Sequence, residues 1–137
     1  MDEECTLIFF KPSAIERGLV GEILSRFEKK GLRIKELRTV YITRSMAEEI
    51  YSVHIGKPFF EKIVELIANK HIVAAILCGR EAISVVRTLI GATDPTKAQP
   101  GTIRGDYGLD ITDNVIHASD SRESFEKESK ILFSNST

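Results

Sequence analysis

The sequence has no tryptophan, two cysteines and four prolines among 137 residues, and its formal net charge is only −1. Such a balance indicates neither a basic surface for nucleic acid nor an acidic disordered arm. The longest apolar run is too short to cross a bilayer, and the start MDEECTLIFF has acids where a signal peptide has bases. These absences predict a single cytoplasmic domain over 1–137 that needs neither nucleic acid nor a membrane.

The few cysteines and histidines also limit the metal chemistry. Cys5 and Cys78 each lie inside an apolar run and form no CxxC pair, so we expect buried free thiols, as in a reducing compartment. His54, His71 and His117 lack the spacing of metal-ligand pairs. We therefore predict no metal held by protein ligands, and we expect His54 and His71 to be structural or surface residues.

Strands and helices alternate along the chain. Apolar runs or alternation predict strands at 5–10, 32–41, 71–78 and 114–117, with a bulge where the pattern slips at Lys35-Glu36. Helical spacing predicts helices at 18–30, from Thr43 or Ser45 to Tyr51, from Pro58 as first helical residue, at 80–90, and for about ten residues after an Asp120–Glu123 capping pair. This alternation predicts an α/β (α+β) sandwich with helices on one or both sheet faces, and it leaves the strand order open.

Residues 91–113 have little periodicity, and a stretch of that length without structure is uncommon in a compact domain unless it is functional. His117 follows it, in NVIHASDS, where a strand meets a helix N-terminus. A histidine there could be structural, a metal ligand, a general base or a nucleophile. No metal spacing and no hydrolase signature accompany His117, so a nucleophilic imidazole fits best. Glu123, Glu126 or Glu128 could orient it.

Three cations stand at the ends of predicted elements. Lys11 ends the first strand, Arg87 lies off the apolar stripe of helix 80–90, and Arg104 stands in GTIRGDYG. Together with Thr93 and His117 they suit a polyphosphate. The usual phosphate-binding motifs are absent, and no acidic cluster would hold Mg²⁺, so a magnesium ion would arrive on nucleotide phosphates. Phe59 is left outside the core stripe and could stack on a base.

Five segments together resemble the nucleoside diphosphate kinase family: FFKPSAIERGLVGEI, YSVHIGKPFF, VVRTLIGATDP, PGTIRGDYG and NVIHASDS. The resemblance covers essentially the whole chain. It implies a ferredoxin-like βαββαβ core with a four-stranded antiparallel sheet, and a helical pair inserted between the second and third strands. It also implies ping-pong transfer of a γ-phosphate from a nucleoside triphosphate, typically ATP, to a nucleoside or deoxynucleoside diphosphate.

The resemblance also assigns roles to individual residues. His117 matches the phosphorylated histidine, Glu128 the carboxylate that orients it, and Ser119 a nearby hydroxyl. Phe59 matches the base-stacking aromatic. The positions that match phosphate and sugar contacts are Lys11, Tyr51, Arg87, Thr93, Arg104 and Asn114. The alternative function is a catalytically silent nucleotide-binding module of the same fold.

Two residues depart from the family pattern. Ala118 stands where glycine is usual, which would cost about 1 kcal/mol if its φ had to be positive. Ser13 stands where an acid usually follows Lys-Pro, which predicts different hydrogen bonding around Lys11. The short end after ILF resembles bacterial members, and a homo-oligomer is expected, either a hexamer or a tetramer.

Overall fold

The computed structural model describes residues 3–111 and 113–133. A four-stranded sheet in the order β2-β3-β1-β4 lies at its centre, with every neighbouring pair antiparallel. The strands are β1 (Glu4–Phe10), β2 (Arg33–Ile42), β3 (Lys70–Gly79) and β4 (Ile116–Ala118). The α-helices are α1 (Pro12–Glu16), α2 (Val20–Lys30), α3 (Arg44–Ile50), α4 (Phe60–Ile67), α5 (Ala82–Ile90), α6 (Ile103–Tyr107) and α7 (Arg122–Phe133). Two 3-10 turns, η1 (Ser52–His54) and η2 (Pro95–Lys97), complete the described elements.

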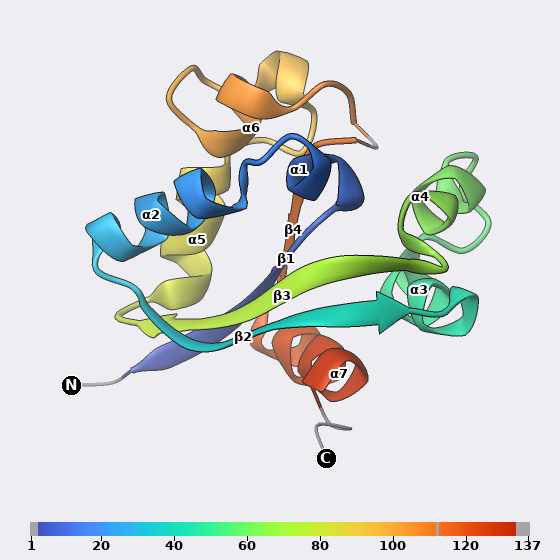
Figure 1. Ribbon diagram of the computed structural model, residues 1–137, viewed down its shortest axis with the longest axis horizontal. Helices are drawn as coiled ribbons and strands as arrows, with labels where there is room; N and C mark the ends of the chain where they lie inside the picture. Colours follow the sequence, from blue (N-terminus) through green and yellow to red (C-terminus); the bar gives the residue numbers. More distant parts are fainter. Residues whose placement is uncertain (1–2, 112, 134–137) are drawn as a thin grey trace.

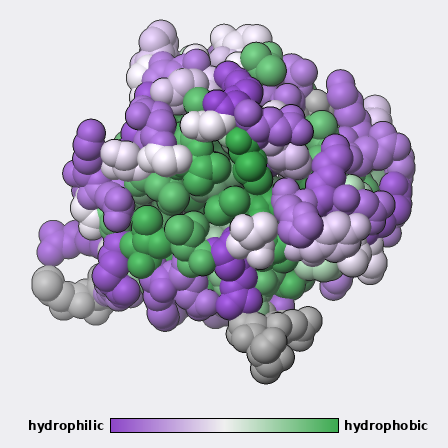
Figure 2. All heavy atoms as spheres, in the orientation of Figure 1, coloured by the Kyte–Doolittle hydropathy of each residue, from purple (hydrophilic) through white to green (hydrophobic). Residues whose placement is uncertain are grey.

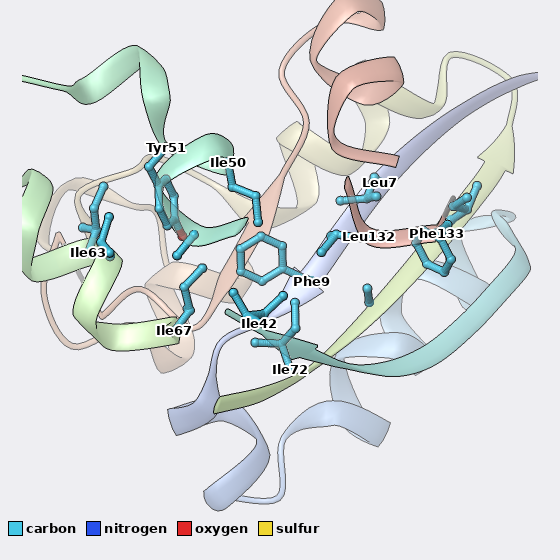
Figure 3. Packing of buried hydrophobic residues seen from close by; sticks show 14 of the residues in the cluster. Leu7, Phe9, Ile42, Ile50, Tyr51, Ile63, Ile67, Ile72, Leu132 and Phe133 are labelled. Carbon is cyan, nitrogen blue, oxygen red and sulfur yellow. The ribbon is translucent and has the colours of Figure 1, made fainter. Parts of the chain in front are cut away.

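Helices cover both faces of this sheet (Figure 1). Successive residues of β1 point to opposite faces, so Leu7 and Phe9 pack with α3, α4 and α7, whereas Ile8 and Phe10 pack with α2 and α5. Figure 3 shows Phe9 near the centre of the first of these two cores. The βαββαβ order, with α3 and α4 inserted between β2 and β3, confirms the predicted ferredoxin-like fold.

Several local predictions are confirmed. The register of β2 against β3 shifts between Ile34 and Glu36, which makes Lys35 the extra residue of a bulge. Thr43 caps α3 by accepting a hydrogen bond from the backbone N–H of Met46 at 3.2 Å. The predicted end of the helix over 18–30 is confirmed at Lys30, because Gly31 follows with φ of 109°, a left-handed conformation that glycine adopts without a Cβ clash.

Other local predictions are wrong. Pro58 is not the first residue of α4, because the helix begins at Phe60 and Pro58 lies in the turn before it. The backbone N–H of Ser124 bonds to the hydroxyl of Ser121 at 3.1 Å, so Ser121 rather than Asp120 caps α7. The stretch 91–113 is not structureless, since it contains η2 and α6. Both of these start at a short polar cap, Asp94 and Thr102, which apolar periodicity does not detect.

The cysteines also differ from expectation. Cys5 and Cys78 are direct partners in the β1–β3 register and form a disulfide, so neither is a free thiol. Sequence spacing gave no sign of this pairing because the two residues are 73 positions apart. They face each other only once the two strands align.

The strand β2 forms one edge of the sheet, and its outer side has no strand partner among the described residues. Two large apolar side chains on it are exposed, Leu37 (49%) and Tyr41 (48%). Figure 2 shows a broad apolar area on the face that carries α2, β2 and β3 in Figure 1. Apolar residues of these elements that are only half-buried are Val20, Leu24, Ile34 and Val73. Within the described ranges, no helix is long and apolar enough to span a membrane.

Candidate active site

One cavity of about 430 Å³ collects almost all the predicted site residues. Nine of the ten line it: Lys11, Tyr51, Phe59, Arg87, Thr93, Arg104, Asn114, His117 and Glu128. The tenth, Ser119, is buried without lining the cavity, and its hydroxyl donates to Glu128. These residues lie just after β1, between α3 and α4, on α5, between α5 and β4, on β4 and on α7, so the fold assembles the cavity from the whole length of the chain.

His117 lies on β4 with its imidazole held at one nitrogen. Its Nε2 is 2.9 Å from Oε1 of Glu128, and the Ser119 hydroxyl donates to the same oxygen at 2.7 Å. Glu128 is buried on α7, so it is fixed relative to the ring. A carboxylate oxygen accepts hydrogen bonds, which assigns the ring proton to Nε2 and leaves the lone pair on Nδ1. The side chain of His117 is 18% exposed, which gives a ligand in the cavity access to it.

Two aromatic rings enclose the imidazole. Phe9 stacks on it with centroids 4.6 Å apart and planes 17° apart, and Tyr51 meets it edge-on at 5.9 Å. Burial raises the pKa of the Tyr51 hydroxyl well above its ordinary value, so this group stays a neutral donor. That hydroxyl has no hydrogen-bond partner within the described residues. A buried donor on the cavity wall without a partner fits a polar ligand.

The three predicted cations line the cavity, which is also lined by Lys127 and by the carboxylates Asp120, Glu123 and Glu128. Lys11 is buried and donates to Oδ1 of Asn114 at 2.7 Å, and burial with the nearby Arg104 charge lowers its pKa to about 7. Burial and the charge of Arg87 lower the pKa of Arg104 to about 10. Arg104 keeps one donor, Nε, without a partner among the described residues. Neighbouring cations that lower one another's pKa values repel each other, so a bound anion would stabilise their charged forms.

Arg104 is held in place from several sides. Its Nη2 donates to the backbone carbonyl of Ile116 at 2.7 Å, and Ile116 directly precedes His117 in the chain. The short helix α6 that carries it starts at Thr102, whose hydroxyl accepts from the N–H of Gly105 at 3.1 Å. A Cβ on Gly105 would collide with the carbonyl oxygen of Gln99, so only glycine permits this approach.

The backbone before His117 contains one strained residue. Val115 has φ of 65°, which is rare for a β-branched residue, and its carbonyl accepts from the N–H of Lys11 at 2.9 Å. This turn presents Asn114 to the cavity, where its amide also donates to the carbonyl of Thr93 at 3.0 Å. Strained backbone of this kind is typical of functional sites.

Comparison with known proteins identifies the family. A family model described as nucleoside diphosphate kinase matches residues 4–137. The chain belongs to the nucleoside diphosphate kinase family. A nucleoside diphosphate kinase of Hyperthermus butylicus is 57% identical over 135 residues, which cover 98% of this chain and 95% of that protein. The enzyme of Staphylothermus marinus is 55% identical over 133 residues, with 97% and 94% covered.

Solved nucleoside diphosphate kinases agree in structure. The Aquifex aeolicus enzyme superposes with a TM-score of 0.91 at 44% identity, covering 98% of this chain and 97% of that one. The Halobacterium salinarum enzyme, solved in complex with CDP, gives 0.93 at 39% identity, covering 98% and 90%. This chain is thus a phosphotransferase that moves phosphate from a nucleoside triphosphate to a nucleoside diphosphate. The general mechanism of nucleoside diphosphate kinases is ping-pong through a phosphohistidine.

The two departures from the nucleoside diphosphate kinase pattern have simple structural outcomes. Ala118 lies in the strand β4 and has no positive φ, so the cost expected for an alanine there does not arise. Ser13 donates a 2.5 Å hydrogen bond to Oδ1 of Asp113. Asp113 is one of the two carboxylates whose charge raises the pKa of Lys11, so the Ser13 hydroxyl bonds to a group that acts on that lysine.

Several cavity residues were not predicted. His54, expected as a structural or surface residue, lines the cavity, and the Lys57 amine lies 3.3 Å from its Nδ1. Ile111 also lines it and is 53% exposed, an unusual position for isoleucine. Lys127 reaches it from α7 while donating to the Ser52 hydroxyl at 2.6 Å. No sequence pattern singled out Ile111, because Ile103 and Leu109 are also apolar residues of 91–113.

Proposed function

We propose that His117 carries the phosphate between the two nucleotides, within one domain formed by residues 1–137. The observation that carries this proposal is the bond from Nε2 to Glu128, which leaves the nucleophilic lone pair on Nδ1 of an imidazole that lines the cavity. Ser119 bonds to the same carboxylate oxygen and keeps Glu128 in place. A fixed neutral imidazole next to three cations suits attack on a phosphate.

The chemical step is an in-line displacement on the γ-phosphorus. The lone pair of Nδ1 forms the N–P bond while the bond from phosphorus to the β–γ bridging oxygen breaks, and its electrons leave with the nucleoside diphosphate. The Nε2 proton stays on the ring, and the positive charge that develops there is offset by Glu128. In the second half-reaction, a terminal oxygen of the acceptor diphosphate takes the phosphoryl group and regenerates the neutral imidazole.

The other site residues bind and orient the substrate. Lys11, Arg87 and Arg104 offset phosphate charge, and Tyr51 and Thr93 supply further polar contacts. Lys11 and Asn114 are joined by a 2.7 Å hydrogen bond and would contact the sugar. Phe59 is 37% exposed at the cavity and offers a ring face for the base. Stacking without edge contacts would accept any base, and the sugar contacts of Lys11 and Asn114 would accept a ribose or a deoxyribose.

Magnesium fits this site as a companion of the nucleotide. Among the described residues, the one cluster of potential ligand groups is Glu3 with Cys5 and Cys78, away from the cavity, and both its sulfurs are in the disulfide. Mg²⁺ bound to the phosphates would draw charge from the transferring group. The chain's own cations, Lys11, Arg87 and Arg104, would hold the remaining phosphate charge.

Identifying the phosphorylated residue tests the proposal. The protein is treated with γ-labelled ATP, and the adduct is tested for acid lability and base stability before peptides are sequenced by mass spectrometry. We expect one labelled site at His117, and the label should move to GDP or dCDP on addition of either. A catalytically silent module of the same fold would bind ATP but take up no label. Label on another residue would overturn the assignment.

We also propose that the chain forms a homo-oligomer through the edge of its sheet. Support comes from the long open edge of β2, from exposed Leu37 and Tyr41, and from the apolar area beside them. An open edge with apolar side chains is unstable in water unless another chain covers it. Both assemblies that the resemblance implies, hexamer and tetramer, hold an even number of chains. Native mass spectrometry should show an even multiple of 15.3 kDa, and Leu37→Lys with Tyr41→Lys should lower that multiple; a monomeric wild type would contradict the proposal.

Nucleotide binding is expected to take up a proton at alkaline pH. Burial and Arg104 lower the pKa of Lys11 to about 7, so the free enzyme holds this amine increasingly neutral above that pH. A bound phosphate restores the charged form, and affinity for ADP should therefore fall as pH rises from 7 to 9. Calorimetry of ADP binding at pH 8, in two buffers of different ionisation enthalpy, should give close to one proton taken up per site. At pH 6, where Lys11 is already charged, no uptake by this group is expected.

Lys11→Arg provides the control for this measurement, because arginine stays protonated throughout this range. It should bind ADP without the alkaline proton uptake. Equal uptake by wild type and Lys11→Arg would assign the proton to another group.

A cytoplasmic location is also a proposal. The Cys5–Cys78 disulfide removes the argument for it that rested on free thiols.

A further inference from the structure

Phe9 lies directly opposite His117. The two residues are Cα partners in the antiparallel β1–β4 register, so their side chains leave the same face of the sheet next to each other. The rings are nearly parallel, with centroids 4.6 Å apart and an interplanar angle of 17°. Phe9 is fully buried, and Figure 3 shows it surrounded by Ile42, Ile67 and Tyr51. The ring of Phe9 therefore cannot move aside without disturbing the core.

The hydrogen bond to Glu128 fixes only part of the geometry of His117. It holds Nε2 at 2.9 Å from the carboxylate, but a single contact at one atom leaves the ring free to tilt about that point. The flat face of Phe9 restricts this tilt on one side, and the edge of Tyr51, at 5.9 Å and 84°, restricts it on another. Three contacts from β1, α7 and the end of α3 thus define the ring plane.

The ring plane decides where the nucleophilic lone pair points. The lone pair of Nδ1 lies in the plane of the imidazole, and in-line transfer requires it to align with the breaking phosphorus–oxygen bond. We propose that Phe9 is a positioning residue for phosphate transfer, which holds the imidazole of His117 in the plane that aims Nδ1 at the nucleotide. This inference rests on the proposed role of His117. Phe9 also stays in contact between the half-reactions, when no nucleotide is present to orient the ring.

The neighbouring Phe10 offers a matched control. It lies on the same strand and is equally buried, but it points to the opposite face, into the core with α2 and α5, and its register partner is Ile116. Phe9→Leu and Phe10→Leu therefore remove the same ring from the same strand and create similar packing defects. Only Phe9→Leu removes the flat surface under the imidazole. A leucine keeps apolar volume but presents a rounded face that permits tilt.

The experiment compares wild type, Phe9→Leu and Phe10→Leu in three measurements. These are the single-turnover rate of phosphorylation by ATP, the Kd for ADP, and the site of the label. We expect Phe9→Leu to slow phosphorylation roughly ten- to a hundredfold, as small misplacements of reacting groups do, with the Kd for ADP within about twofold of wild type. Phe10→Leu should phosphorylate within about twofold of wild type. Phe9→Met, which fills more of the space, replaces Phe9→Leu if that variant does not fold.

Each result has a distinct meaning. Equal rates for the variants at Phe9 and Phe10, whether both normal or both slow, would overturn the positioning role while leaving phosphorylation of His117 intact. A slow Phe9 variant with equally weakened ADP binding would also overturn it, since that pattern indicates general damage to the pocket. Wild-type label on a residue other than His117 would instead overturn the proposed function itself.

Discussion

Replacing His117 with alanine is expected to abolish phosphate transfer while leaving nucleotide binding nearly intact. In the proposed mechanism the imidazole forms the bond with phosphorus, and removal of a nucleophile that acts together with positioned partner groups lowers kcat by roughly four orders of magnitude or more. Lys11, Arg104 and Phe59 remain in place, so the Kd for ADP should change by no more than a few fold. Steady-state turnover with ATP and a second nucleoside diphosphate, together with calorimetry of ADP binding, measures both.

His71→Ala is the matched control for this variant. His71 is an exposed histidine on β3 that does not line the cavity, so its removal changes the histidine count without touching the site. We expect it to turn over at the wild-type rate and to take up label normally. If His117→Ala retains turnover above a hundredth of the wild-type rate, another group carries the phosphate, or the transfer proceeds directly between two bound nucleotides.

Features that depend on a few neighbouring residues could be predicted from the sequence, whereas features that depend on packing between distant segments could not. The caps Thr43 and Gly31 and the bulge at Lys35 were predictable, because each depends on a few neighbouring residues. The start of α4 and the cap of α7 were placed a residue or two away from where they lie. There, several polar or turn-forming residues compete locally, and packing selects among them.

The site shows the same division. Its chemistry was evident from residue types at the ends of elements, as with Lys11 and Arg104. The choice of Glu128 over Glu123 and Glu126 was not, because it depends on how α7 rotates against the sheet. The contact of Phe9 with His117 depends on the register between two strands more than one hundred residues apart, and no local pattern carries that information.

The second large effect is expected from reduction of the Cys5–Cys78 disulfide, which should lower the free energy of unfolding. Its two cysteines are 73 positions apart, and closing a loop of that length in the unfolded chain is worth roughly 4 kcal/mol in the chain-entropy model. Protein that is reduced while unfolded and then refolded with reductant should therefore be about 4 kcal/mol less stable than the oxidised form. Urea unfolding at 25 °C, followed by circular dichroism, measures the difference. Because neither cysteine lines the cavity, kcat for the reduced protein should stay within about twofold of the oxidised value below its unfolding transition.

A variant with Cys5→Ala and Cys78→Ala separates the bond from other effects of reductant. It should unfold at the same urea concentration with and without reductant, close to the reduced wild type, because only the cross-link between β1 and β3 is lost in both. Alkylation of the denatured wild type before reduction gives an independent check. If two alkyl groups are added without reductant, the cysteines are free thiols, and the strand pair holds them side by side without a bond. If the disulfide is intact and stability is still unchanged by reduction, residual structure around these strands persists in the unfolded chain and removes the entropic gain.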